Sequence, residues 1–281
     1  MARSLRNDQA TTSKITPFRV VSERASATER GQLLEAGLVV LDALSYERTG
    51  LLRSDICAIL NLDDAIASEV IAVLEKHGLL SYDARRDVYI AGVRSLGLGH
   101  SYSTETPLIR AANPTLARIR DQSNETTILT VRWGEYRVNI AQASGHHLFN
   151  RAPPPIKPLH LGSGGKILLS GMSDIELAGY VQRLKAGHAA HIGDSDFDAM
   201  IESLREIRKT GVAEGFSERS RESASFATAV RDDAGGILGA LVVSVPLHRY
   251  QDGLRHRVLQ LLINGAEEIS DEYLRNGSFE H

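Results

Sequence analysis

Residues 53–78 read RSDICAILNLDDAIASEVIAVLEKHG, and the spacing of the apolar residues in this stretch decides the fold of the N-terminal half. The spacing predicts a short helix over residues 53–60, a four-residue break, and a longer helix that Gly78 ends. The apolar residues of the longer helix that we expect to be buried are Ile66, Val70, Val73 and Leu74. Two helices separated by so tight a break are typical of a helix-turn-helix motif.

The flanking segments extend this motif. Residues 32–45 predict a preceding helix, and β-prone runs at 79–82 and 88–90 predict a hairpin with Arg85 and Arg86 at its tip. Three helices followed by a hairpin make a winged helix-turn-helix, which we assign to residues 32–98. This geometry lets the third helix lie in the major groove of DNA and the hairpin lie beside phosphates.

Composition restricts the class of protein. The chain has 281 residues, of which 42% are hydrophobic and 24% charged, with a net charge of −3, so a disordered chain or a coiled-coil rod is excluded. The sequence has no long apolar run and no apolar signal near its start, which predicts a cytoplasmic protein without a membrane partner. The single cysteine, Cys57, excludes a cysteine-built zinc site, and we expect no metal and no cofactor.

Two segments outside the motif leave alternatives open. The first 30 residues carry six basic and three acidic side chains, so residues 1–31 are either a solvated flexible tail or a basic arm that touches phosphates. Residues 106–123 predict a helix that begins at Pro107, with Pro114 expected to kink or split it. Its apolar stripe fits a linker that dimerises, which we assign to residues 99–124, or a helix packed on its own domain.

The C-terminal half, residues 125–281, predicts an α+β fold. Two hairpins, near residues 126–144 and 225–246, indicate an antiparallel sheet, because strands follow one another without intervening helices. A glycine-rich stretch at 161–165 opens a helix, and free N–H groups at a helix start favour an anion. Ile167 after Lys166 excludes a phosphate-binding P-loop, since that motif needs a hydroxyl residue there.

These features resemble the IclR (isocitrate lyase regulator) family of bacterial transcription regulators over roughly residues 33–275. The motifs that carry the resemblance are LEKHGLL at 74–80, PLH at 158–160, GKILLS at 165–170, IRKTGVA at 207–213 and LVVSVP at 241–246. The resemblance implies a winged helix that binds operator DNA and a linker helix. It also implies a GAF-like antiparallel-sheet domain that binds a small effector, often a carboxylate or an aromatic acid. It further implies a dimer, or a tetramer built as a dimer of dimers.

The resemblance also implies the effector-binding residues. A position that is acidic in some members is Gly215 here, which has no side chain. The residues that align with the family's effector contacts are Ser163, Gly164, Gly165, Ser225 and Ser244.

The predicted DNA-binding face is unusual in its charge. Residues 33–97 carry six basic and ten acidic residues, a net charge of −4, which weakens the attraction to phosphates. Glu69 can accept from cytosine N4, and the basic side chains can hold phosphates. The residues expected to contact DNA are Arg53, Asp64, Ala65, Ser68, Glu69, Arg85 and Arg86.

The leading hypothesis is therefore a ligand-responsive, DNA-binding transcription regulator. The alternative is a small-molecule sensor or interaction protein whose helix-turn-helix no longer binds DNA. An enzyme is not expected, because the sequence shows no dinucleotide fingerprint and no nucleophile elbow at residues 161–165.

Overall fold

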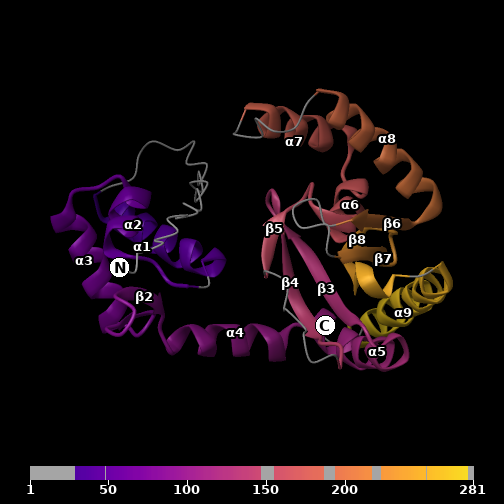
Figure 1. Ribbon diagram of the computed structural model, residues 1–281, viewed down its shortest axis with the longest axis horizontal. Coiled ribbons are helices and arrows are strands. Elements are labelled where there is room, and N and C mark those ends of the chain that lie inside the picture. Colours follow the sequence, from indigo (N-terminus) through magenta and orange to yellow (C-terminus); the bar gives the residue numbers. More distant parts are fainter. Residues whose placement is uncertain are drawn as a thin grey trace, which may run out of the picture.

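The computed structural model describes residues 29–47, 49–146, 155–186, 194–216, 223–250 and 252–277. These residues form two units joined by one helix (Figure 1). The N-terminal unit contains α1 (Glu29–Tyr46), α2 (Arg53–Leu60), α3 (Asp64–Lys76), β1 (Leu80–Asp83) and β2 (Val88–Ala91). Helix α1 begins inside the segment predicted as an arm, and residues 1–28 lie outside the described residues.

The helices and the hairpin of the N-terminal unit share one core, in the order that the sequence predicts. The backbone of Leu51 pairs with Tyr89, with N–H to O distances of 2.9 and 2.7 Å, and so ties the segment before α2 to the hairpin. The buried core residues are Ala36, Val40, Leu51, Ile56, Val70, Ile71, Leu74 and Leu80.

The buried face of α3 differs from the prediction. Ala67 and Ile71 are buried, whereas Ile66 is 36% exposed and Val73 is 50% exposed. Two overlapping sets of residues in this helix have apolar spacing, and packing against α1 and α2 selects the set that includes the small Ala67. Helix α3 therefore presents more apolar surface to solvent than its sequence predicts.

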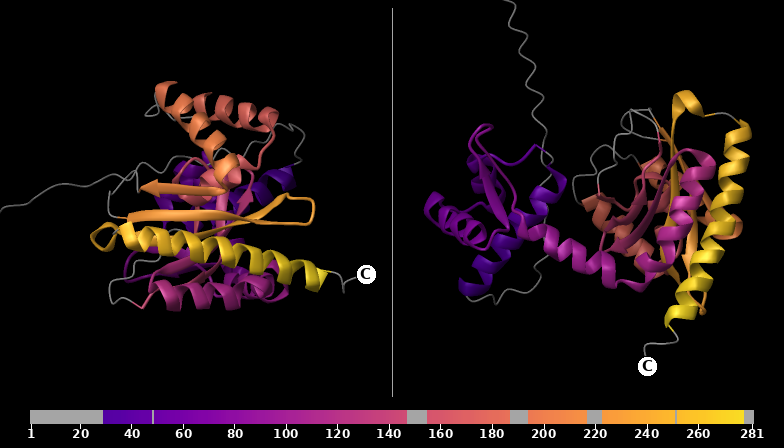
Figure 2. Two further views of the ribbon diagram at one scale, coloured as in Figure 1. Left: turned by 90° about the vertical axis from the view of Figure 1, so that its right-hand side faces the viewer. Right: turned by 90° about the horizontal axis from the view of Figure 1, so that it is seen from below.

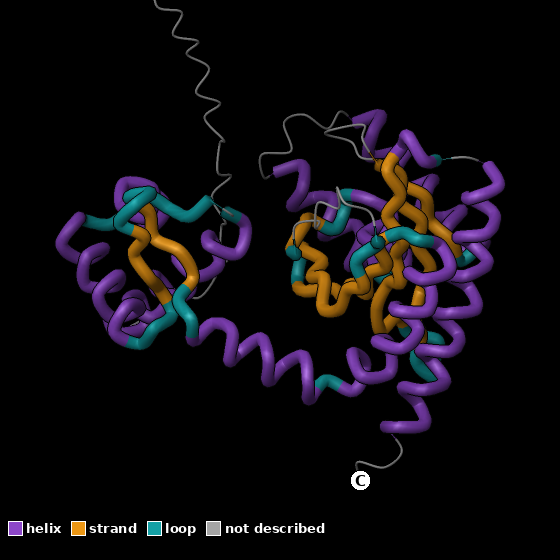
Figure 3. Tube along the Cα trace, turned by 60° about the horizontal axis from the view of Figure 1, so that its bottom comes forward, coloured by secondary structure: helices purple, strands orange, loops and turns teal. Residues whose placement is uncertain are grey.

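Helix α4 (Arg94–Glu105) connects the two units and has no buried residue (Figure 3). Helix α5 (Pro107–Ser123) follows it and continues through Pro114 without a break. The apolar side of α5, including Leu116 and Ile119, is buried in the C-terminal unit. Of the two interpretations of the 106–123 helix, packing on its own domain is the one seen within the chain.

The C-terminal unit is built on an antiparallel sheet in the order β5-β4-β3-β8-β7-β6. The hairpins at β3–β4 and β7–β8 appear as predicted, whereas the short β5 and β6 were not predicted from the sequence. Its strands are β3 (Thr126–Trp133), β4 (Tyr136–Ala143), β5 (Ile156–Pro158), β6 (Val212–Phe216), β7 (Ser223–Arg231) and β8 (Ile237–Pro246). Its helices after α5 are α6 (Gly162–Ser170), α7 (Asp174–Ala186), α8 (Asp194–Thr210), the short η1 (Leu247–Arg249) and α9 (Asp252–Gly277).

Helices cover both faces of this sheet (Figure 2). Helices α5 and α9 lie side by side on one face, where Leu129 and Leu241 are buried. Helices α6, α7 and α8 lie on the other, where Ile128 and Val242 are buried. Because neighbouring residues of one strand point to opposite faces, β3 and β8 contribute to both cores. Within the described ranges, no helix combines the length and apolarity needed to cross a membrane.

Candidate functional site

The first turn of α6 contains the predicted glycines, so they are helical residues rather than a loop before the helix. A Cβ atom on Gly164 would lie 2.8 Å from Val242 Cγ2 and 3.0 Å from Thr130 Cγ2. A Cβ atom on Gly165 would lie 1.9 Å from the carbonyl oxygen of Leu159. Both glycines therefore let α6 approach the sheet and the preceding turn closely. Packing alone accounts for them.

Ser163 and Ser225 lie together at this turn. The Ser163 hydroxyl donates to Ser225 Oγ at 2.9 Å, and Ser225 Oγ in turn donates to the carbonyl oxygen of Gly215 at 3.2 Å. Ser244 lies directly opposite Ser225 on the neighbouring strand, and its side chain is half-buried on the same face. The structure thus brings the predicted hydroxyl residues to one place.

Arg137, on β4, is a residue of this site that the sequence interpretation missed. Its side chain is only 8% exposed. Nε donates to the carbonyl oxygen of Leu161 at 3.4 Å and Nη1 donates to Asn139 Oδ1 at 3.1 Å. In the described part of the chain it meets no carboxylate, and Nη2 lies 3.6 Å from the point where a Cβ on Gly162 would stand. The guanidinium therefore lies beside the start of α6.

Lys157 is the second cation of the site. In the register of β4 and β5 it lies directly opposite Arg137, so both side chains project from the same face of the sheet. Burial and, to a smaller extent, the nearby Arg137 charge together lower the pKa of the Lys157 amine to about 8. Burial alone lowers the pKa of Arg137 to about 10, which leaves it charged at neutral pH.

Glu214, the acidic residue of this region, forms its ion pair with a residue other than Arg137 or Lys157. Glu214, next to Gly215, forms an ion pair with Arg255 of α9, with one contact of 3.2 Å between Nε and Oε2. A side chain at Gly215 is excluded, because its Cβ would lie 2.7 Å from the backbone nitrogen of Ser163. The start of α6 is therefore a positively charged site, which can bind an anion.

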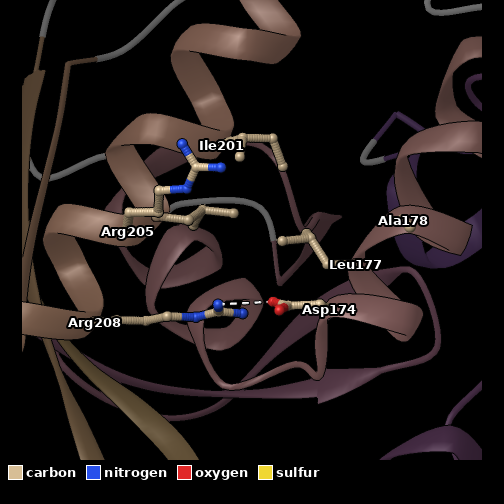
Figure 4. Close-up of a pocket in the computed structure, with 7 residues that line it drawn as sticks. Asp174, Leu177, Ala178, Ile201, Arg205 and Arg208 are labelled. Carbon is tan, nitrogen blue, oxygen red and sulfur yellow. Dashed lines mark hydrogen bonds and ion pairs between the residues drawn. The ribbon is translucent and has the colours of Figure 1, made fainter.

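A cavity of about 270 Å³ lies elsewhere, between α7 and α8 (Figure 4). Arg208 at its wall donates to the Asp174 carboxylate at 2.9 Å and to the carbonyl oxygens of Ser170 and Met172 at 2.9 and 2.8 Å. All three nitrogens of this guanidinium are thus engaged, and they tie α8 to the end of α6. We assign this cavity a structural role. The residues that line it are Asp174, Leu177, Ala178, Ile201, Leu204, Arg205 and Arg208.

On the N-terminal unit, three of the predicted DNA-contacting residues bind one another. Arg53 pairs with Asp64 through two contacts, at 3.1 Å from Nε and 2.9 Å from Nη2, and Nη2 also donates to Ser68 Oγ. The hydrogen bond from Arg53 keeps the pKa of Asp64 below its ordinary value. The ion pair is exposed, so the surface of α3 is less acidic than its count of carboxylates indicates.

The remaining predicted residues of this face are exposed. Ala65 and Glu69 lie open on α3, and Arg85 projects from the hairpin without an ion pair to the described residues. Arg86 is held by Asp83, with 2.7 Å between Nε and Oδ2. The α3 surface is not covered by another described part of the chain. In the same described ranges, no three His, Cys, Asp or Glu side chains are grouped as a metal would require.

Comparisons with known proteins agree with this arrangement. The profile of a family described as the C-terminal region of the bacterial transcriptional regulator IclR matches residues 100–271. The HTH-type transcriptional regulator BhcR of Paracoccus denitrificans is 24% identical over 239 residues, which cover 84% of this chain and 85% of BhcR.

Solved structures share the α+β fold with its curled antiparallel sheet. The crystal structure of an IclR transcriptional regulator from Alicyclobacillus acidocaldarius superposes with a TM-score of 0.73 at 19% identity, covering 86% of this chain and 98% of that one. An IclR homolog from Microbacterium hydrocarbonoxydans, solved in complex with 4-hydroxybenzoate, has a TM-score of 0.67 at 19% identity, with the same coverage of 86% and 98%.

Proposed function

Since the chain belongs to the IclR family of bacterial transcriptional regulators, we propose that it is a cytoplasmic, ligand-responsive regulator that binds operator DNA. The N-terminal unit is the winged helix-turn-helix, and the C-terminal unit binds a small carboxylate or aromatic acid at the start of α6. The proposal depends on one combination of features. The N-terminal unit has an exposed α3 surface, and the C-terminal unit has a buried arginine, Arg137, that meets no carboxylate in the described part of the chain. Ligand binding shifts the placement of two such winged helices through the connecting helix.

The α3 surface recognises bases mainly through apolar contacts and through the carboxylate of Glu69. Ala65, Ile66 and Val73 are exposed on it, and methyl groups of this kind contact the thymine methyl. Glu69 accepts a hydrogen bond from cytosine N4. Arg85 contacts phosphate directly, whereas Arg53 reaches a phosphate oxygen only when its ion pair with Asp64 opens.

The effector is an anion because Arg137 lies at the start of α6 and Lys157 lies opposite it on the neighbouring strand. The homolog from Microbacterium hydrocarbonoxydans was solved with 4-hydroxybenzoate, a carboxylate, which supports this ligand class for the family fold. We assign no catalytic step to Ser163, because its hydroxyl bonds to another hydroxyl, that of Ser225, rather than to a general base. The homologues are likewise transcriptional regulators.

A second copy of the chain is the expected partner of α4. This helix exposes Leu96, Leu98 and Tyr102, and no residue of it is buried. An unpacked helix with several large apolar side chains favours self-association, so we propose a dimer, which can associate further into a dimer of dimers.

The alternative function is a sensor whose helix-turn-helix does not bind DNA. The ion pairs of Arg53 and Arg86 favour it, because both occupy cations that a phosphate would otherwise use. Fluorescence anisotropy of the full chain, on its own upstream DNA and on a shuffled duplex of equal composition, distinguishes the two functions. Selective binding at low salt is the expected result, and equal binding to both duplexes would contradict gene control.

The variant Arg85→Ala with Arg86→Ala tests the hairpin in the same assay. We expect affinity to fall about tenfold for both duplexes, because phosphate contacts carry no sequence information. The matched control is Arg205→Ala with Lys209→Ala on α8, which removes the same charge from an exposed surface of the other unit. If the hairpin variant binds like this control, the hairpin does not hold phosphate.

A further inference from the structure

Two cations face each other across the edge of the sheet, and this arrangement is unfavourable without a counter-ion. Arg137 and Lys157 occupy directly opposed positions on β4 and β5. Like charges in opposed positions destabilise an antiparallel pair, and burial increases the repulsion. Arg137 is buried, and Lys157 is partly buried.

The described part of the chain supplies no counter-ion to either group. Two acidic residues of the neighbouring segments are paired elsewhere: Glu135, two residues before Arg137, pairs with Arg183, and Glu214, next to Gly215, pairs with Arg255. The hydrogen bonds that Arg137 makes go to neutral oxygens of Leu161 and Asn139. A carboxylate at residue 215 is sterically excluded by the Ser163 backbone. Two positive charges thus remain to be balanced at one place.

Donors for an anion converge on the same point. A Cβ on Gly162 would lie 3.6 Å from Arg137 Nη2 and 4.0 Å from Ser225 Oγ, so these two groups flank the first residue of α6. Gly162 adopts a φ of 75°, a conformation that glycine reaches without strain. The first N–H groups of α6 start here and favour negative charge. Arg137 therefore lies where it can hold one carboxylate beside the start of α6, while Lys157 lies opposite it on the edge strand β5.

We infer that the site binds a small dicarboxylate, with one carboxylate held by Arg137 at the start of α6 and the second held by Lys157. This inference rests on the proposed function, because it specifies the ligand class of the same site. Arg137 is the anchor for any carboxylate, and Lys157 determines the preference for a second one. Monocarboxylates, including aromatic ones, bind through Arg137 alone and leave the Lys157 charge unbalanced.

Isothermal titration of the full chain with two matched ligand pairs tests the inference. Succinate and butyrate share four carbons, and phthalate and benzoate share the aromatic ring, so each pair differs by one carboxylate. We expect the diacid of at least one pair to bind at least about tenfold more tightly than its monoacid. Equal affinities within both pairs, or no binding of any probe up to about 10 mM, would overturn the inference.

Two variants assign the preference to its residues. Lys157→Met keeps the length of the side chain and should reduce the diacid preference to less than about threefold, while leaving monoacid affinity within about twofold. Arg137→Gln should weaken both members of a pair by more than about tenfold. Lys209→Met on α8, which removes an exposed cation far along the chain, is the control and should leave both affinities unchanged.

The outcome separates this inference from the proposed function. Because Lys157 lies on an edge strand, its variant is informative even if Arg137→Gln does not fold. A diacid preference that survives in Lys157→Met overturns the inference and leaves ligand-responsive DNA binding intact. Loss of selective DNA binding in the anisotropy assay overturns the proposed function. The titration measures the ligand preference independently of that result.

Discussion

Arg137 shows how one residue specifies the chemistry of a site. A guanidinium with 8% exposure is costly unless its charge is balanced, and here its described hydrogen bonds reach only neutral oxygens. A bound carboxylate removes this cost, since a carboxylate matches the fork of the guanidinium. Binding and stability are therefore coupled at this position.

The sequence predicts the hydroxyl residues of the site but not its cations. Ser163 and Ser225 were expected because they align with family motifs, and the structure brings them within 2.9 Å. Arg137 lies in a strand most of whose other residues are half-buried, and it pairs with β5, a strand of three residues with no alternating pattern. Long-range pairing of this kind leaves no local signal in the sequence.

The Lys157 amine makes stability depend on pH. Its pKa is lowered to about 8, so between pH 8 and its unfolded value near 10.5 the unfolded chain binds more protons, and stability rises with pH. Below pH 8 both states are charged and the penalty is complete. We expect Lys157→Met to be more stable than wild type at pH 7, by about 1 kcal/mol after allowance for solvent screening. Urea unfolding should show the difference shrinking toward zero by about pH 10.5, and a constant difference would contradict this account.

Asp64 controls the availability of Arg53. The variant Asp64→Asn removes one negative charge and weakens the ion pair, so Arg53 becomes free to contact phosphate. We expect affinity for every duplex to increase, with a salt dependence steeper by about one unit of slope. The control is Glu202→Gln on α8, which makes the same charge change in the other unit. An unchanged salt slope would show that Arg53 does not contact DNA.

At the scale of elements, apolar spacing predicts where helices occur more reliably than which face they bury. Helix α3 appears where the sequence places it, yet Ile66 and Val73 are exposed and Ala67 and Ile71 are buried. Both sets have the spacing of one helix face, so the packing of α1 and α2 against α3 decides which set is buried. The consequence bears on the proposed function, because the exposed set is the one that we propose contacts DNA.

The pairing of α5 with α9 stabilises the C-terminal unit. Leu116 is fully buried there, and Gly265 allows the close approach, since a Cβ on it would lie 2.6 Å from Ile119 Cδ1. We expect Leu116→Ala to lower the free energy of unfolding by about 2–5 kcal/mol, whereas Ile175→Ala, at an exposed position of α7, should change it by less than about 0.5 kcal/mol. Thermal or urea unfolding measures both. Equal effects would contradict the packing described here.

At the scale of the whole molecule, a helix and an aromatic contact connect the described parts of the two units. Helix α4 joins them in the chain, and the end of α1 meets the β3–β4 hairpin through Tyr46 and Tyr136, whose ring centroids lie 6.3 Å apart. Tyr136 is the neighbour of Arg137 in β4, so a ligand at the cations acts on a strand that touches the N-terminal unit. This contact gives the ligand a short physical route to the DNA-binding unit.

Self-association through α4 is tested by placing a charge on its surface. Leu98 is 68% exposed, and Tyr102 lies one turn further along the same face of the helix. We expect Leu98→Asp to shift the chain toward monomer in sedimentation velocity, because the carboxylate is desolvated in an apolar interface. Ile175→Asp makes a similar change on α7, where it should have no effect. A dimer unchanged by Leu98→Asp would place the interface elsewhere.

The most direct test of the account measures DNA affinity with and without a dicarboxylate. In wild type, saturating succinate or phthalate should change the affinity for the upstream DNA by at least about fivefold, in either direction. In Arg137→Gln, which removes the anchor of the carboxylate, the same additions should change it by less than about twofold. A DNA affinity that no diacid alters in wild type, or that changes equally in both proteins, would contradict the claim that an anion at the start of α6 controls the DNA-binding unit.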